Sequence, residues 1–283
     1  MATIRPAPGK PKTLPPIHPN AGLEAAYRRK IEQLVDEMHR SLVYWLTAAY
    51  RANPPEMAQD APEGGGGQYS RQSPAMALRS AMRKLGRRWT KRFDDMAPEL
   101  AKYFATAVGE RVDGTLATIL EKAGWTVKFK MTAAANDVMQ ATIGEQVGLI
   151  KSIAQQHLTE VEGLVMRSVQ TGRDLGTLTK DLEARYGVTR RRASLISRDQ
   201  NAKATATIQR VRQQEIGVTH AKWVHSGAGR HPRPSHVKAG QDGVVYKISE
   251  GWLDPETGKR IWPGTEINCG CICRSIIPGI GPR

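Results

Sequence analysis

Residues 23–50, LEAAYRRKIEQLVDEMHRSLVYWLTAAY, carry the clearest structural pattern in the chain. Apolar side chains recur there at spacings of three and four, at Tyr27, Ile31, Leu34, Met38, Leu42, Trp45 and Ala49. This spacing places them on one face of a helix of about seven turns. The helix is expected to end at Asn53, because two prolines follow and a residue before proline is pushed out of the helical conformation.

The segments on either side of this helix differ from it in composition. Residues 1–20 hold six prolines and no acidic residue, which predicts an extended, disordered tail. Residues 56–73 include four consecutive glycines and are expected to form a linker. Helical periodicity then returns and predicts further helices, with glycine-containing joints, at about 74–93, 97–123, 132–145, 147–170, 174–186 and 189–214. Alternation over 125–131 predicts a short strand.

After Gly217 the helical period disappears, and glycine and proline become dense. Short β-prone runs follow at 221–225, 244–248 and 271–277. We therefore predict a mainly α-helical N-terminal region of long amphipathic helices, followed by a small α+β C-terminal module with short strands. The predicted organisation is a tail at 1–20, a helical region at 21–130 with its linker at about 56–73, a helical lead-in at 131–215 and the module at 216–283.

The net charge of +15 is concentrated in two helical segments. The segment 71–92 holds eight basic residues and no acidic one, and 185–215 holds eight basic residues against Asp199 and Glu215 and includes the run of three arginines at 190–192. Such fields attract polyanions, so nucleic acid and an acidic protein surface are both candidate partners. Contacts to phosphates would be independent of base sequence. The candidate nucleic-acid-binding residues are Arg79, Arg83, Lys84, Arg87, Arg88, Lys91, Arg92, Arg190, Arg191 and Arg192.

Two classes of protein are disfavoured by what the sequence lacks. No run of about 18 apolar residues occurs, which excludes a transmembrane helix, and the N-terminal segment has no apolar core of a secretory signal. The three cysteines, Cys269, Cys271 and Cys273, lie within five residues and are odd in number, so they do not form a disulfide framework. We expect synthesis in a cytosol.

The C-terminal module contains an unusual series of turn-forming and functional residues. A tryptophan precedes an arginine-rich segment that ends in Arg233-Pro-Ser-His236, and the series closes on a proline and the turn Asn268-Cys-Gly-Cys271. The order and spacing of these residues resemble those of the phage Mu F-like head morphogenesis family of minor head proteins. The resemblance extends over about residues 130–278. Its motif positions in this chain are Trp223, Arg230, Arg233, His236, Gly243, Pro263, Asn268, Cys269 and Cys271.

The resemblance implies a non-enzymatic virion protein, made in the cytoplasm of the bacterial host and bound inside the capsid at the portal vertex. Such proteins act in head assembly, DNA packaging or DNA ejection. The implied partner is the phage portal protein, and the major capsid protein, a scaffolding protein and non-specifically bound phage DNA are further candidates. No membrane partner is expected in the assembled head.

Zinc is the alternative to a module without a cofactor. Thiolates and imidazoles suit this ion, and the candidate ligands are His236, Cys269, Cys271 and Cys273, with His231 as a further histidine nearby. The Cys-x-Cys spacing argues against zinc, because structural zinc sites usually pair cysteines two to four residues apart. The competing interpretation is a strand whose small residues pack inward.

Two further functions remain open at this point. A metal-dependent nuclease would use His236 as general base with Asp242 or Asn268 on the metal, but no compact set of carboxylates for two-metal chemistry is visible. A cellular nucleic-acid-binding protein would share the basic surface. For Trp223, Arg233 and His236 the structural interpretation is a buried tryptophan, with the arginine and histidine donating hydrogen bonds to turn carbonyls. The functional interpretation is a surface for portal or DNA.

Overall fold

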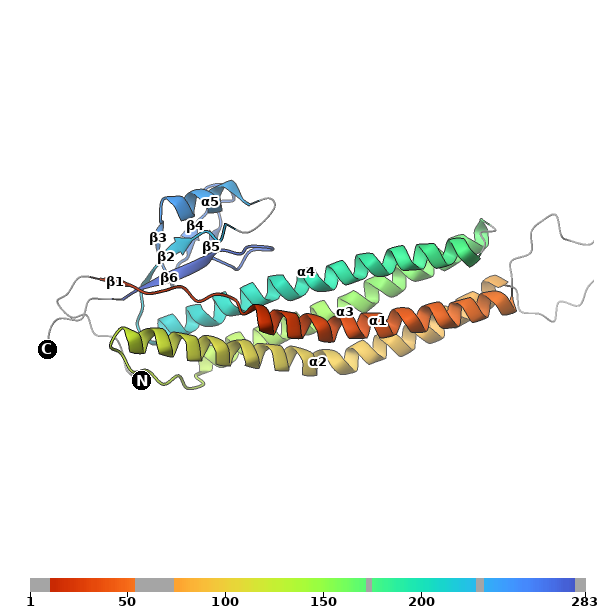
Figure 1. Cartoon of the computed structure of the whole chain (residues 1–283), viewed down its shortest axis with the longest axis horizontal. Helices are drawn as coiled ribbons and strands as arrows, with labels where there is room; N and C mark the ends of the chain where they lie inside the picture. The colour runs from red at the N-terminus through yellow and green to blue at the C-terminus, as the bar shows by residue number, and fades with distance from the viewer. Residues whose placement is uncertain (1–10, 54–73, 172–174, 228–231, 278–283) are drawn as a thin grey trace, which may run out of the picture. The chain divides into compact units, whose positions relative to one another are not determined.

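The computed structural model describes residues 11–53, 74–171, 175–227 and 232–277. Within these ranges the chain forms five helices and six strands (Figure 1). The helices are α1 (Ala21–Ala52), α2 (Pro74–Lys122), α3 (Ala133–Gln170), α4 (Leu175–Glu215) and α5 (Pro234–Gln241). The strands are β1 (Lys12–Thr13), β2 (His220–Val224), β3 (Val245–Lys247), β4 (Trp252–Leu253), β5 (Arg260–Ile261) and β6 (Ile272–Ile277). The predicted fold class is confirmed, since long helices are followed by a small α+β module.

The chain divides into two compact units, and the boundary between them falls inside the four long helices. The first, here called the bundle unit, comprises residues 28–100 and 146–194. The second, here called the sheet unit, comprises residues 1–27, 101–145 and 195–283. The C-terminal module therefore shares a unit with helical segments that are distant from it in the sequence.

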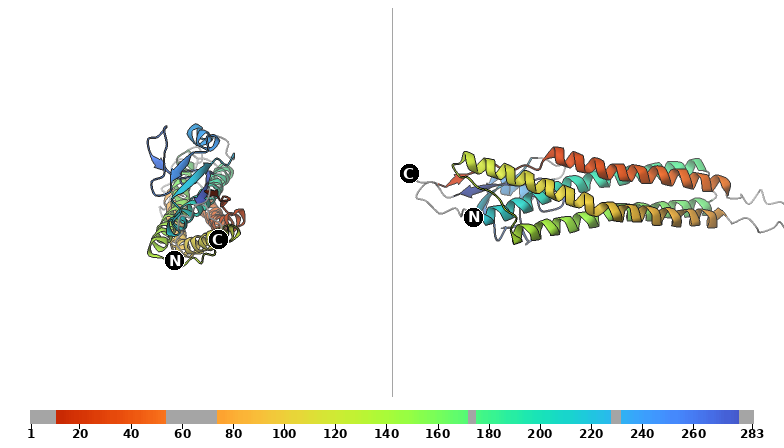
Figure 2. Two further views of the ribbon diagram at one scale, coloured as in Figure 1. Left: turned by 90° about the vertical axis from the view of Figure 1, so that its left-hand side faces the viewer. Right: turned by 90° about the horizontal axis from the view of Figure 1, so that it is seen from below.

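In the bundle unit, segments of α1 to α4 run alongside one another in alternating directions (Figures 1 and 2). The segment of α1 buries a stripe with helical spacing at Ile31, Val35, Met38, Leu42 and Leu46. The predicted stripe was wrong near its end, because the buried position after Leu42 is Leu46, and Trp45 is 50% exposed. None of the described helices carries an apolar stretch long enough to cross a membrane.

Polar contacts also join the helices of the bundle unit. The guanidinium of Arg190 on α4 lies 3.0 Å from the carboxylate of Glu32 on α1. The ammonium of Lys151 on α3 lies 3.0 Å from Asp94 on α2. This last pair is exposed enough that water and salt screen it, so it contributes at most about 1 kcal/mol. The buried apolar stripes must therefore supply most of the stability of this unit.

The long helices are continuous at three positions where the sequence predicts joints. Continuous helix is found at 94–96 in α2, at residue 146 in α3 and at 187–188 in α4. Buried side chains continue across the first of these joints, as Phe93 and Ala97 show. The predicted joints at these positions were therefore wrong. The reason is that local helix propensity is a weak influence, which packing overrides.

In the sheet unit, four strands form an antiparallel sheet in the order β1-β6-β2-β3. The central pair is β2 and β6, in which Trp223 lies opposite Cys273. β4 and β5 form a separate two-stranded hairpin. Three of these strands, β2, β3 and β6, coincide with the predicted β-prone runs. β1, β4, β5 and α5 were not predicted.

β1 comes from the segment that the sequence predicts to be a disordered tail. Its Lys12 pairs with Ile277 of β6, and the amide of Leu14 donates a 2.8 Å hydrogen bond to the carbonyl of Ser275. Leu14 and Ile17 are 1% and 2% exposed. The prediction of disorder was therefore wrong for this part of the tail, because β6 offers a free edge and the two apolar side chains enter the core. Residues 1–10 lie outside the described ranges.

α4 connects the sheet with the other helices of the sheet unit. The Gln213 side chain donates a 2.7 Å hydrogen bond to the hydroxyl of Ser275 on β6. Arg212 is 4% exposed, and its guanidinium makes two 2.8 Å hydrogen bonds to Asp113 on α2. The same guanidinium donates to the carbonyl of Lys130 at 2.8 Å. The predicted strand at 125–131 is absent, and one of its carbonyls instead accepts a hydrogen bond from this arginine.

Candidate functional site

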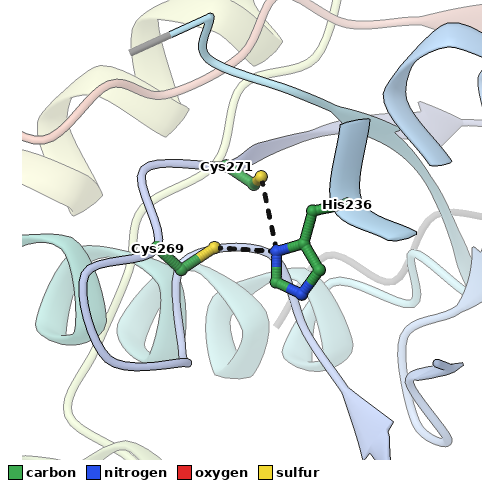
Figure 3. Close-up of side chains that lie close together, drawn as sticks. All are labelled: His236, Cys269 and Cys271. Carbon is green, nitrogen blue, oxygen red and sulfur yellow. Dashed lines mark hydrogen bonds between the residues drawn. The ribbon is translucent and has the colours of Figure 1, made fainter. Parts of the chain in front are cut away.

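Three side chains of the metal-ligating type converge in the sheet unit (Figure 3). His236 extends from α5, and Cys269 and Cys271 come from the segment that leads into β6. The Nδ1 atom of His236 lies 3.5 Å from the Sγ of Cys269 and 3.8 Å from the Sγ of Cys271. All three residues are buried, with exposed fractions of 3 to 5%. We call this group the His-Cys-Cys cluster.

The local sequence explains how α5 presents His236. Pro234 occupies the first turn of α5, where a missing amide donor costs nothing. The guanidinium of Arg233, just before the helix, donates a 3.1 Å hydrogen bond to the carbonyl of Ile267 in the cysteine turn. At the other end of α5, a Cβ on Gly240 would lie 2.8 Å from the backbone nitrogen of His225. Only glycine allows this approach of the helix to the end of β2.

The two cysteines are placed by a tight turn. Asn268 has a φ of 57°, in the left-handed region that asparagine tolerates better than most residues. Its amide donates a hydrogen bond of 2.6 Å to the carboxylate of Asp199 on α4. The turn is therefore held from both sides, by α4 through Asp199 and by the start of α5 through Arg233.

Aromatic rings enclose the cluster on the side of the sheet. Trp223 of β2 is fully buried, and its ring centroid lies 5.1 Å from that of His236 in an edge-to-face arrangement. The Trp252 ring lies 5.0 Å from that of Trp223. These rings remove water from the cluster and lower the local dielectric.

The two thiols influence each other's protonation. The pKa of Cys269 is lowered to about 4, because hydrogen bonds from Cys271, His236 and the backbone amides of Cys271 and Gly264 outweigh the effect of burial. The pKa of Cys271 is raised, because it hydrogen-bonds to the Cys269 sulfur, is buried and lies beside the charge of that sulfur. The pair therefore favours one thiolate and one thiol.

A buried carboxylate acts on the same histidine. Asp254 is 1% exposed and accepts hydrogen bonds from the Glu256 amide at 3.1 Å and the Thr257 hydroxyl at 2.9 Å. Burial alone would raise the pKa of Asp254, but these hydrogen bonds and the electrostatic effect of His236 lower it below its ordinary value. A negative charge is thus maintained in the electrostatic environment of the histidine.

The structure brings together three of the four predicted metal ligands. Cys273 is not part of the cluster, and its sulfur instead accepts hydrogen bonds from Gln209 at 3.5 Å and Gln213 at 3.6 Å. The predicted set was wrong in this residue, because Cys271 precedes β6 whereas Cys273 lies within it, so strand alternation does not relate the two. His231 lies outside the described residues.

The other motif residues have structural surroundings. Gly243 follows α5 with a φ of 60°, a conformation that glycine adopts without strain. Pro263 is buried and lines a small cavity of about 20 Å³ together with Cys271 and Arg210. The Arg210 guanidinium stacks 4.2 Å from the centroid of the Trp262 ring. Arg230 lies outside the described residues.

The predicted basic residues separate into two groups, both in the bundle unit. All seven on α2 are exposed, namely Arg79, Arg83, Lys84, Arg87, Arg88, Lys91 and Arg92. Of the three on α4, Arg190 pairs with Glu32 and Arg192 donates a 2.9 Å hydrogen bond to the Ser152 hydroxyl. Arg191 is exposed. A basic surface is therefore formed by α2, and most of the α4 run is engaged within the bundle unit.

The sequence analysis missed Trp252 and Asp254, which belong to the surroundings of the cluster. The segment Asp254-Pro-Glu-Thr-Gly258 joins β4 to β5, and its composition is typical of a turn in which an aspartate accepts hydrogen bonds from residues that follow it. This pattern was available in the sequence. The proximity of the turn to His236 was not.

Comparisons with known proteins place this site in a phage-related region. Residues 159–274 match the family described as Phage Mu protein F like protein, and this is the head morphogenesis family that the motifs resemble. Residues 159–274 of this chain are thus similar to that family, and we call them its Mu F-like region. An uncharacterized protein of Haemophilus influenzae is 31% identical over 137 residues, which are 47% of this chain and 28% of that relative. The chain accordingly spans less than a third of the relative's length, and no solved structure matches.

Proposed function

We propose that this protein is a minor head protein of a tailed bacteriophage. The observation that carries the proposal is the Mu F-like match over residues 159–274, which includes α5 and the cysteine turn. We place the protein inside the capsid near the portal, where it acts without enzymatic activity in head assembly, DNA packaging or DNA ejection. Its direct partner in this proposal is the portal protein.

The basic surface on α2 supports a position beside packaged DNA. Its seven exposed cations contact solvent along one helix, and in a filled head the nearest polyanion is the genome. Lysine and arginine contacts to phosphates hold a protein on DNA without reading the bases. A head protein requires contacts of this non-specific kind.

The nuclease alternative is less well supported. It assigns His236 the role of general base, but this ring is 3% exposed and its Nδ1 is directed at two sulfurs. The proposed metal-binding partners Asp242 and Asn268 are both exposed, and Asp242 is not among the residues that converge on the histidine. A base that activates water for attack on a phosphodiester must reach its substrate.

The proposal is tested by co-expressing the protein with the portal protein of the same phage genome. Size-exclusion chromatography at moderate and at high salt should show a stable complex under both conditions, because a specific interface relies on apolar contacts that salt does not screen. A portal protein from an unrelated phage is the matched control and should not co-elute. Absence of a complex, together with DNA cleavage on addition of a divalent cation, would overturn the proposal in favour of a nuclease.

A further inference from the structure

The His-Cys-Cys cluster has a geometry that ordinary core packing does not require. One nitrogen and two sulfurs lie within 4.8 Å of one another, and both sulfurs lie on the same Nδ1 atom (Figure 3). A single imidazole nitrogen has either one proton to donate or one lone pair to accept with. It therefore makes a good hydrogen bond to at most one of the two sulfurs, whereas a cation between the three atoms binds all of them.

The distances agree with those around a tetrahedral ion. Zinc binds sulfur at about 2.3 Å and imidazole nitrogen at about 2.0–2.1 Å. With a tetrahedral angle, these bond lengths place nitrogen and sulfur about 3.6 Å apart. The two Nδ1–Sγ distances in the cluster are 3.5 and 3.8 Å.

We propose that His236, Cys269 and Cys271 bind one zinc ion, which fastens α5 to the turn that precedes β6. Thiolate and imidazole ligands select zinc over calcium or magnesium, which prefer oxygen. Among the described residues no fourth side chain of the ligating type joins the cluster.

The surroundings of the cluster suit a bound cation. The turn that carries the two sulfurs is already fixed by Arg233, which donates to the carbonyl of Ile267, and by Asp199, which accepts from the amide of Asn268. Nδ1 faces the sulfurs and Nε2 is buried without a hydrogen-bond partner in the described residues.

The elements around the cluster are short, although the sheet is also bonded to α4 within its unit. Its hairpin strands β4 and β5 have two residues each, and β3 has three. Small modules with so little regular structure commonly rely on a metal or a disulfide for stability. The three cysteines of this chain are free thiols, so a metal is the link that their arrangement permits.

The first experiment measures metal in the full-length protein. Purified without chelator, it should contain about one zinc ion per chain by elemental analysis. After removal of zinc, titration with Co²⁺ should produce thiolate-to-cobalt charge-transfer absorption and the intense visible bands of tetrahedral coordination. Zinc should then displace the cobalt and remove both signals.

Matched variants locate the site. Cys269→Ser, Cys271→Ser and His236→Asn each remove one ligand and should reduce the zinc content to less than about a tenth of an ion per chain. Cys273→Ser removes the neighbouring thiol that hydrogen-bonds to α4, and it should retain the full zinc content and the cobalt spectrum. Far-ultraviolet circular dichroism verifies that the long helices are intact, so that loss of metal is not loss of fold.

Three outcomes would overturn the inference. These are a wild-type protein that neither contains zinc nor gives a cobalt charge-transfer band, a ligand variant that keeps its zinc, or a disulfide between Cys269 and Cys271 revealed by two missing free thiols. None of them bears on the head protein proposal, which depends on the portal complex. Conversely, a zinc-containing protein that does not bind portal would retain the metal site and lose only the proposed function.

Discussion

His157 is a buried histidine at the centre of the bundle unit. It is 1% exposed, and its Nδ1 lies 2.8 Å from the hydroxyl of Thr189. Its Nε2 has no hydrogen-bond partner among the described residues. The pKa of His157 is lowered from 6.5 to about 4, by burial first and then by the positive charges of His39 and Arg185. The folded bundle thus requires the neutral ring.

This histidine makes stability depend on pH. Between pH 6.5 and 4 the unfolded chain binds the proton and the folded chain does not, so the free energy of unfolding should fall as pH falls. The stabilisation is complete above about pH 6.5, and its loss approaches about 3 kcal/mol near pH 4. Urea unfolding of wild type and of His157→Gln at pH 7 and pH 4.5 measures the free energy of unfolding. This free energy should fall less between the two pH values in the variant than in the wild type.

His18→Gln is the matched control, since His18 is exposed. It should retain the wild-type dependence on pH. An identical dependence in His157→Gln and wild type would show that the buried ring does not bind its proton differently in the two states.

Side-chain types in the cysteine turn were readable from the sequence, but their directions were not. The sequence identified Cys269, Cys271 and His236 as candidates for zinc and included Cys273 with them. Which thiols share a site depends on where β6 begins, and a segment with cysteine at every second residue does not indicate this. The contact with α5 is also long-range, because His236 and Cys269 are separated by 33 residues.

At the level of elements, periodicity predicted the helices well and their ends poorly. The apolar spacing of three and four follows the buried faces of α2, α3 and α4. The predicted joints relied on residues such as Gly187, which lies within continuous helix in α4. β1 was missed because two paired residues leave no periodic signal. Only the partner strand reveals why Lys12 and Thr13 are extended.

The packing of the segment after β1 gives a direct test. Leu14→Ala should lower the free energy of unfolding by about 2–5 kcal/mol, because a fully buried leucine leaves a cavity. Leu195→Ala, in the same unit but 45% exposed, should change it by less than about 0.5 kcal/mol. Urea unfolding followed by tryptophan fluorescence measures both. Equally small changes in the two variants would mean that residues 12–17 are disordered, as the sequence predicts.

For the whole molecule, the net charge can be read directly from the sequence. Which of the charged side chains lie exposed on the surface was predicted correctly for α2 but not for α4. The excess of 15 positive charges follows from composition. The exposed row on α2 was predicted. In the arginine run on α4, Arg190 instead pairs with Glu32 and Arg192 donates a hydrogen bond to Ser152. A sequence shows charges without their partners, and the partners of Arg190 and Arg192 lie 158 and 40 residues away.

The basic surface on α2 predicts how the protein binds DNA. Replacing Arg79, Arg83, Arg87 and Arg92 by Gln should weaken non-specific binding to duplex DNA and reduce the slope of log affinity against log salt by about 3 to 4. Fluorescence anisotropy across a salt series measures both quantities. The change in slope measures how many DNA phosphates the variant no longer neutralises, independently of base sequence.

The control replaces four exposed basic residues outside this surface by Gln, namely Lys102, Arg111 and Lys122 on the later part of α2 and Lys128 beyond it. Net charge is then the same in both quadruple variants, and the control should lose much less affinity. Equal losses would mean that DNA responds to the total charge of the protein and that the basic row at 79–92 of α2 is not a binding surface.

The pairing of β1 with β6 also has a consequence for the timing of synthesis. The ribosome makes Ile277 more than 260 residues after Lys12. β2 likewise waits for β6 before its second edge is covered. A nascent chain that stops early therefore carries open strand edges, which invite aggregation and proteolysis. The sheet is thus complete only in chains translated at least through residue 277, and prematurely terminated copies are the ones that proteases can attack at these edges.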